Sequence, residues 1–93
     1  MADDFKDYKR FELGQRAVKA KWFKWLPGML TLVREGNAWV RGPRLTEDVK
    51  GKVTPPAGAI PDVEDPATRG CVRFAAGLSG DVEILAMALE GLL

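Results

Sequence analysis

A helix and a β-hairpin are expected to meet within the stretch RAVKAKWFKWLPGM, residues 16–29. It carries four cations, two of the three tryptophans of the chain and no acidic residue. Leu26 precedes a proline, which biases it away from the helical region, and Pro27-Gly28 suits the central pair of a type II turn. The sequence therefore predicts that a helix ends before residue 26 and that a turn leads into the next element.

Helical periodicity precedes this stretch. Mostly apolar side chains recur at i, i+3, i+4 and i+7 spacing, and most lysines and arginines lie off that face. The stripe consists of Phe5, Tyr8, Phe11, Gln15, Val18 and Trp22. Asp3 and Asp4 stand at its start, where acidic groups suit the positive end of the helix dipole. We predict a helix over residues 3–21, and a last helical turn or an extended segment over residues 22–25.

Two short apolar runs follow the turn, Met29–Val33 and Ala38–Arg41, and turn residues separate them. This arrangement is typical of an antiparallel β-hairpin. A third strand near Val49–Val53 would extend the hairpin to a three-stranded meander. Thr54–Pro61 contains three prolines and a glycine, which predicts a loop or an extended connector.

Two further helices are predicted in the C-terminal part. Asp65 as N-cap and Pro66 at the first helical position mark the start of a helix over Pro66–Ala76. A final helix is expected over residues 81–91. The predicted fold is a single α+β domain over residues 1–93, with an N-terminal helix, an antiparallel β-hairpin or three-stranded meander, and two C-terminal helices.

The final helix is apolar on nearly all sides, which calls for burial over most of its surface. Complete burial within one copy of so small a domain is difficult. We therefore expect self-association through this helix, as a homodimer, and packing against the sheet within a monomer is the alternative. The residues expected to mediate self-association are Val82, Leu85, Met87, Leu89 and Leu92.

The net charge is only +1, but it is unevenly distributed. Residues 1–52 hold 12 Lys/Arg and 7 Asp/Glu, a balance of +5, whereas residues 53–93 hold 2 and 6, a balance of −4. Such polarity favours an acidic partner for the N-terminal half, or head-to-tail self-association. The other interpretation is that the two halves neutralise each other within the fold.

The residue types that most enzymes need are scarce. The chain has no histidine, which is the commonest general base and metal ligand. Its single cysteine, Cys71, excludes an intramolecular disulfide and a thiolate metal site, and no phosphate-binding or calcium-binding loop pattern occurs. We therefore expect no catalytic residue, no cofactor and no metal, and we predict that the protein is not an enzyme.

The composition favours a globular, cytoplasmic protein. Apolar residues make up 46% of the chain and charged residues 29%, as in an ordinary folded domain. The N-terminal sequence is acidic and polar, unlike a signal peptide, and no apolar run approaches the roughly 20 residues that span a bilayer. We expect no membrane role.

The basic and aromatic run is the remaining candidate for function. Contact with an acidic protein surface is one expectation, because tryptophan and arginine are favoured interface anchors. The residues expected to bind the partner are Arg16, Lys19, Lys21, Trp22, Lys24, Trp25 and Trp39. Single-stranded nucleic acid is the second alternative, since lysines neutralise phosphates and aromatic rings stack on bases. The structural alternative is that the tryptophans pack in the core beside a solvated lysine face.

Two strings carry a family resemblance, WLPGM at residues 25–29 and PDVEDPATRGC at residues 61–71. Together they resemble a family of short, uncharacterised phage and prophage proteins. In those proteins a helix ends in a W-x-P-G-M-like turn, a variable hairpin follows, and a P-D-x-x-D-P-A-T-x-G-C helix start comes near the end. Beyond Cys71 the chain departs from that pattern.

The resemblance implies a phage origin and a place in the host cell cytoplasm. Small, cofactor-free phage proteins often bind and inhibit host machinery or defence. The expected function is therefore a non-enzymatic accessory protein that binds a host protein, with an anti-CRISPR inhibitor as one example. A small nucleic-acid-binding protein that uses residues 16–24 and a structural or assembly oligomer are the alternatives.

Overall fold

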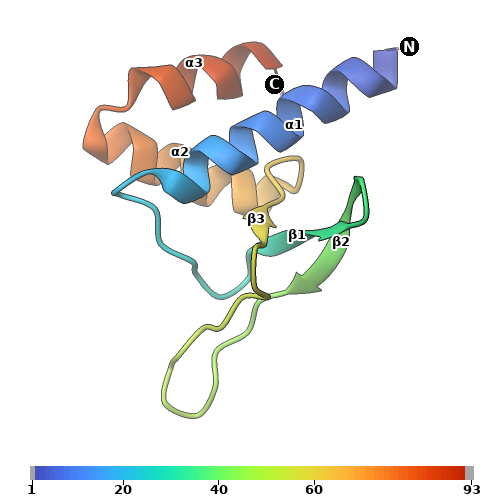
Figure 1. Ribbon diagram of the computed structural model, residues 1–93. Helices are drawn as coiled ribbons and strands as arrows, with labels where there is room; N and C mark the ends of the chain where they lie inside the picture. Colours follow the sequence, from blue (N-terminus) through green and yellow to red (C-terminus); the bar gives the residue numbers. More distant parts are fainter. Residues whose placement is uncertain (1, 92–93) are drawn as a thin grey trace.

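In the computed structural model, residues 2–91 form three helices and a three-stranded antiparallel sheet (Figure 1). The elements are α1 (Ala2–Lys19), β1 (Leu30–Glu35), β2 (Ala38–Arg44), β3 (Ile60–Pro61), α2 (Pro66–Ser79) and α3 (Val82–Gly91). The structure describes residues 2–91, and the side chains of residues 9–86. The predicted α+β class, with one N-terminal and two C-terminal helices, is confirmed.

α1 ends at Lys19, and residues 23–26 are not helical. Two single-turn bonds close the helix, from Ala20 N–H to the Ala17 carbonyl and from Phe23 N–H to the Ala20 carbonyl. The turn at Pro27-Gly28 is present as predicted. Met29 N–H donates to the Leu26 carbonyl at 3.2 Å, and Gly28 has a φ of 92°, as a type II turn requires.

β1 and β2 form the predicted antiparallel hairpin, in which Val33 lies opposite Val40. The third strand differs from the prediction. β3 pairs with the other edge of β1, with Leu32 opposite Ile60, so the sheet order is β2-β1-β3 and the chain does not form a meander. Val49–Val53 contributes only a single bridge from Val53 to Glu47. The burial of Ile60 and Pro61 explains why this pair, rather than the exposed Val49, covers the free edge.

The loop between β2 and β3 projects from the end of the sheet away from the helices (Figure 1). Its base is anchored by the buried Leu45, which exchanges backbone hydrogen bonds with the turn: Gly28 N–H donates to its carbonyl and its own N–H donates to Met29. Farther out, the Asp48 carboxylate accepts from Lys50 N–H and Lys52 N–H at 2.8 and 2.9 Å. The loop is thus held in shape by its own hydrogen bonds.

α2 begins as predicted, with the Asp65 carboxylate accepting from Thr68 N–H and Pro66 in the first turn. It continues beyond the predicted end at Ala76 to Ser79, because Gly77 is tolerated within the helix and the stop comes at Gly80. Gly80 has a φ of 71° and donates to the carbonyls of the last turn, a C-cap that glycine favours. Asp81 then caps α3 by accepting from Ile84 N–H.

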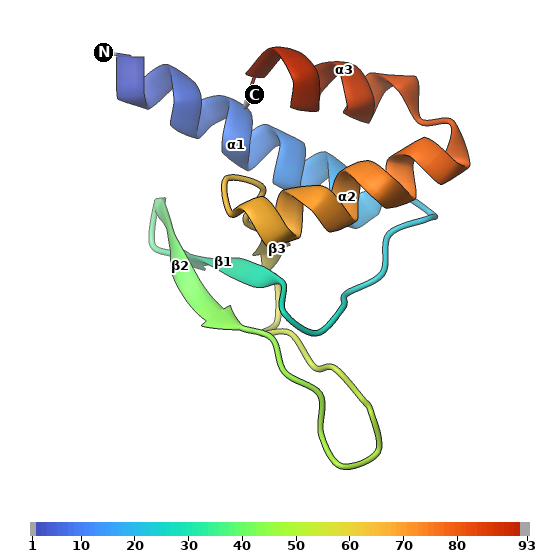
Figure 2. The ribbon, with the colours of Figure 1, turned by 180° about the vertical axis from the view of Figure 1, so that it is seen from behind.

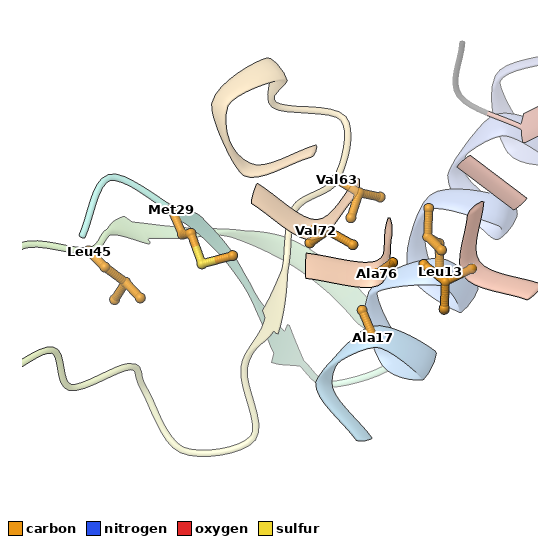
Figure 3. Close-up of a cluster of buried hydrophobic side chains, with 8 residues drawn as sticks. Leu13, Ala17, Met29, Leu45, Val63, Val72 and Ala76 are labelled. Atoms are coloured by element: carbon orange, nitrogen blue, oxygen red, sulfur yellow. The ribbon is translucent and has the colours of Figure 1, made fainter. Parts of the chain in front are cut away.

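The core lies between the helices and the sheet (Figure 3). Seen from behind, α2 lies between α3 and the sheet (Figure 2). The buried cluster draws side chains from all three helices and from the segments next to the strands; its members are Leu13, Ala17, Met29, Leu45, Val63, Val72, Ala76 and Ile84. α1 also approaches β3 closely at Gly14, where a Cβ atom would lie 2.7 Å from the Pro61 carbonyl oxygen. Glycine therefore permits the contact between this helix and the sheet edge.

Candidate partner-binding groove

Ion pairs within the fold join the basic N-terminal half of the sequence to its acidic C-terminal half. Arg10 makes two bonds of 2.7 Å to the fully buried carboxylate of Asp62. Arg44 pairs with Asp65 at 3.1 Å, and Arg16 pairs with Glu83. Each pair joins a cation of the N-terminal half to an acid of the C-terminal half. The interpretation that the halves neutralise each other is therefore supported for these arginines.

Asp65 joins the start of α2 to the sheet. Its carboxylate accepts from the Arg44 guanidinium, from Thr68 N–H and from the Thr68 hydroxyl. The Arg44 hydrogen bonds are the main reason that the pKa of Asp65 is lowered from 3.8 to about 2. The same Thr68 hydroxyl accepts from Leu30 N–H at 2.8 Å, so a helix cap and the first residue of β1 share one network.

Two of the residues expected to bind a partner make contacts within the fold, from α1 and the segment after it to the start of α3. The indole Nε1 of Trp22 donates to Asp81 at 2.9 Å, and its half-buried ring packs against the core. Arg16 forms ion pairs with Glu12 and Glu83. Trp25, which is also half-buried, packs against the same core, so the structural alternative describes both Trp22 and Trp25.

Three other expected residues line a single groove. Lys19 lies at the end of α1, Trp25 in the segment between α1 and β1, and Trp39 in β2, and together they border a hollow of about 520 Å³. The remaining lining residues are Gln15, Val18, Pro55, Pro56, Ala57, Gly58, Ala59 and Ile60. We call this hollow the Trp25–Trp39 groove. Two tryptophans and two prolines give it rigid apolar walls, and a lysine provides a charged rim.

Trp39 is held in place by its neighbours. Its ring centroid lies 6.3 Å from that of Phe11 in α1, at a tilted angle, and the Arg34 guanidinium lies 5.4 Å from the ring in a cation–π arrangement. Trp25 is fixed in a similar way by Phe23, whose ring lies edge-on at 5.0 Å. Both indoles are therefore positioned before any partner arrives.

A second hollow is also bordered by Trp25. It has a volume of about 550 Å³, and Lys24 and Lys52 line it together with Trp25 and Glu47. Lys21 is exposed and lines neither hollow. The structure thus places four of the seven expected residues, Lys19, Lys24, Trp25 and Trp39, around two adjoining hollows.

Sequence reasoning missed the wall that the β2–β3 loop contributes. The sequence predicts only a connector for the segment Pro55–Gly58, and it predicts a strand for the residues around Lys52. The adjacent prolines were the available signal, since two successive prolines restrict the backbone and suit a rigid wall. Their position opposite Trp25 and Trp39 depends on the pairing of β3 with β1, which no local pattern reveals.

The residues expected to mediate self-association occupy different environments. Val82 is exposed, whereas Leu85 is half-buried and packs against the core beside the buried Ile84. The side chains of Met87 and Leu89, and Leu92 as a whole, lie outside the described residues. Two exposed apolar residues that the prediction omitted, Phe74 and Leu78, lie on α2.

Within the described part of the chain, no three His, Cys, Asp or Glu side chains gather closely enough to hold a metal ion. None of the described helices combines the length and apolar character needed to cross a membrane. Comparisons with models of known protein families, with curated proteins and with solved structures found no match.

Proposed function

We propose that this protein is a non-enzymatic binding protein that recognises an acidic surface of another protein through the Trp25–Trp39 groove. One observation carries the proposal: Lys19, Trp25 and Trp39 come from three separate segments and line the same hollow. The described residues that line this groove include a lysine and no acid. An acidic partner would therefore meet complementary charge at the rim.

The walls of the groove suit protein recognition. Tryptophan contributes a large contact area for few rotatable bonds and is enriched among interface hot spots. Because Trp25 and Trp39 already pack against Phe23 and Phe11, binding would order few additional side chains. Little conformational entropy would then oppose association.

The resemblance to phage and prophage proteins makes a bacterial host protein the expected partner. Under this proposal the protein acts by covering a surface of that partner, and inhibition of a host defence system is one consequence. The lysines would speed the encounter with an acidic surface, since electrostatic complementarity mainly raises the association rate.

Affinity capture from a bacterial host lysate tests the proposal. We expect the wild-type protein to retain a discrete host protein, and Lys19→Glu combined with Lys24→Glu to lose it. Lys50→Glu is the matched control, because Lys50 is equally exposed and lines neither hollow. Equal recovery with all three baits would argue against the groove.

Single-stranded nucleic acid is the second candidate, and the placement of Trp25 favours it. This indole lies beside Lys24 and Lys52. The arrangement suits a base that stacks on the indole while the two lysines neutralise neighbouring phosphates. A salt titration separates the two candidates. Binding to an oligonucleotide that weakens steeply with salt would support nucleic acid, and absence of binding at low salt would exclude it.

A further inference from the structure

Gln15 interrupts the mostly apolar stripe of α1, between Phe11 and Val18. The structure places it in the Trp25–Trp39 groove, and it also borders a third hollow of about 300 Å³ together with Phe11, Glu12 and Trp39. Gln15 is half-buried, and its amide makes no hydrogen bond with the described residues. Amides that are withdrawn from water normally have a partner, so this one is free to bind a ligand.

The walls around this amide are mostly apolar, and they include Val18, Pro55 and Pro56. An apolar surface that covered the groove would remove the Gln15 amide from water without giving it a partner, which would lower the affinity. A ligand must therefore bring hydrogen-bonding groups to this point. The backbone of an extended segment does so, because its N–H and C=O groups are not paired within the segment. A helix does not, because its backbone groups bond to each other.

The β2–β3 loop offers backbone donors to the same groove. Residues 56–59 form a tight turn, in which Ala59 N–H donates to the Pro56 carbonyl at 3.2 Å and Gly58 has a φ of 72°. Ala57 and Gly58 at the centre of this turn are exposed, and their N–H groups make no hydrogen bond with the described residues. An extended segment in the groove can therefore be held through its backbone from α1 and from the loop.

The lysines around the groove are not used by the fold. Lys19 borders the groove, and Lys24 and Lys52 border the adjoining hollow. Unlike Arg16, these three lysines form no ion pair with the described residues. The adjoining hollow also contains Glu47, whereas no acid borders the groove itself. Lys19 is therefore the favoured contact for an acidic side chain of the ligand.

We propose that the Trp25–Trp39 groove binds an extended, acidic peptide segment of the partner protein. Gln15 hydrogen-bonds the backbone of this segment, and an acidic side chain of the segment meets Lys19. A large apolar side chain fills the hollow that Trp25 and Trp39 border. The inference rests on the proposed function, because it names what the same groove recognises. It goes further, because a folded acidic surface of the partner is not required.

Selection from random linear peptides of about 12 residues, with the wild-type protein immobilised, tests this ligand class. We expect the enriched peptides to combine one large apolar residue with an acidic residue two to four positions away, because side chains of an extended segment reach the same side at short spacings. These peptides should also displace a host protein that the wild-type protein captures from a lysate.

Fluorescence anisotropy of a labelled, selected peptide then measures the contribution of each contact. Lys19→Glu should raise the dissociation constant at least tenfold, because it reverses the charge at the rim of the groove. Lys21→Met is the matched control, since Lys21 is exposed and lines neither the groove nor the adjoining hollow, and it should leave the dissociation constant within about twofold.

Gln15→Met separates recognition of the peptide backbone from support of the fold. Methionine has a similar length and a similar helix propensity but lacks the amide. We expect the thermal denaturation midpoint to stay unchanged and the dissociation constant for the peptide to rise at least fivefold. If Gln15 were merely structural, the midpoint would fall and the affinity would not change.

Absence of an enriched peptide would overturn the extended ligand, and so would enriched peptides that lack an acidic residue. Undiminished binding by Gln15→Met, or a selected peptide that becomes helical on binding as seen by circular dichroism, would overturn it as well. A host protein that is retained through Lys19 and Lys24 but is not displaced by the selected peptides would overturn the extended ligand alone and leave the proposed function standing. Binding of an oligonucleotide in preference to every peptide would overturn both.

Discussion

The indole nitrogen of Trp22 donates a hydrogen bond of 2.9 Å to the carboxylate of Asp81, 59 residues farther along the chain. The other oxygen of that carboxylate accepts from Ile84 N–H and caps α3. One acidic side chain thus fixes the start of the last helix and ties it to the segment that follows α1. This relationship gives Trp22 a structural role.

Replacing Trp22 by phenylalanine should separate the hydrogen bond from the packing. The ring would still pack against the core, but the bond to Asp81 would be lost, and we expect a loss of about 1 kcal/mol in the free energy of unfolding. Trp22→Ala should cost about 3 kcal/mol, because the apolar contact is removed as well. Urea denaturation measures both, and equal losses would show that the hydrogen bond alone matters.

Gly14 should tolerate no side chain. A methyl group there would lie 2.7 Å from the Pro61 carbonyl oxygen, so α1 or β3 must shift, and we expect Gly14→Ala to destabilise the fold by about 1–3 kcal/mol. Gly70→Ala is the control, because its methyl group meets nothing within 4 Å, and it should stabilise the helix by up to about 1 kcal/mol. Thermal denaturation of both variants measures the two changes. A neutral Gly14→Ala would contradict the close approach.

Arg10 and Asp62 should be strongly coupled. Removing the cation by Arg10→Met leaves a buried carboxylate, which Arg41 approaches only to 3.6 Å, and we expect a loss of about 3 kcal/mol. Arg10→Met combined with Asp62→Asn should cost less than the sum of the two single substitutions. A double-mutant cycle by chemical denaturation gives the coupling energy, and additive losses would mean that the pair is not coupled.

Asp65 should make the stability depend on pH in the acidic range. Its pKa is about 2 in the folded protein, because of Arg44 and Thr68, against an ordinary value of 3.8. The lowered pKa means that the stabilisation is complete above the ordinary value and is lost as the pH falls toward about 2. Between pH 3.8 and about 2, the free energy of unfolding should fall more steeply with decreasing pH for the wild-type protein than for Asp65→Asn. Arg44→Gln should raise the pKa of Asp65, as measured by NMR of the carboxyl carbon, and an unchanged value would contradict the assigned cause.

Local signals in the sequence predicted most elements of the fold. Pro27-Gly28 and Asp65-Pro66 each combine restricted backbone angles with a capping or turn residue, so they marked a turn and a helix start without tertiary information. The end of α2 was misplaced because two glycines compete there, and only the backbone angle of Gly80 distinguishes the cap from the tolerated Gly77.

Long-range pairing explains what could not be predicted. β3 consists of two residues, Ile60 and Pro61, within a proline-rich stretch that resembles a loop, and it becomes a strand only because β1 offers a free edge. The groove depends on that pairing, since it sets the Pro55–Gly58 wall opposite Trp25 and Trp39. The bond from Arg10 to Asp62 likewise joins residues 52 apart that no periodicity connects.

Site-specific photo-crosslinking in host cells tests the partner-binding groove most directly. A photoreactive phenylalanine analogue replaces Ala57, which is exposed and lines the groove, and in a matched control it replaces Glu35, which is exposed on the β1–β2 hairpin outside it. The groove predicts a discrete protein adduct from position 57 that disappears with Lys19→Glu, and none from position 35. Adducts of equal yield from both positions, or an adduct from position 35 alone, would contradict it.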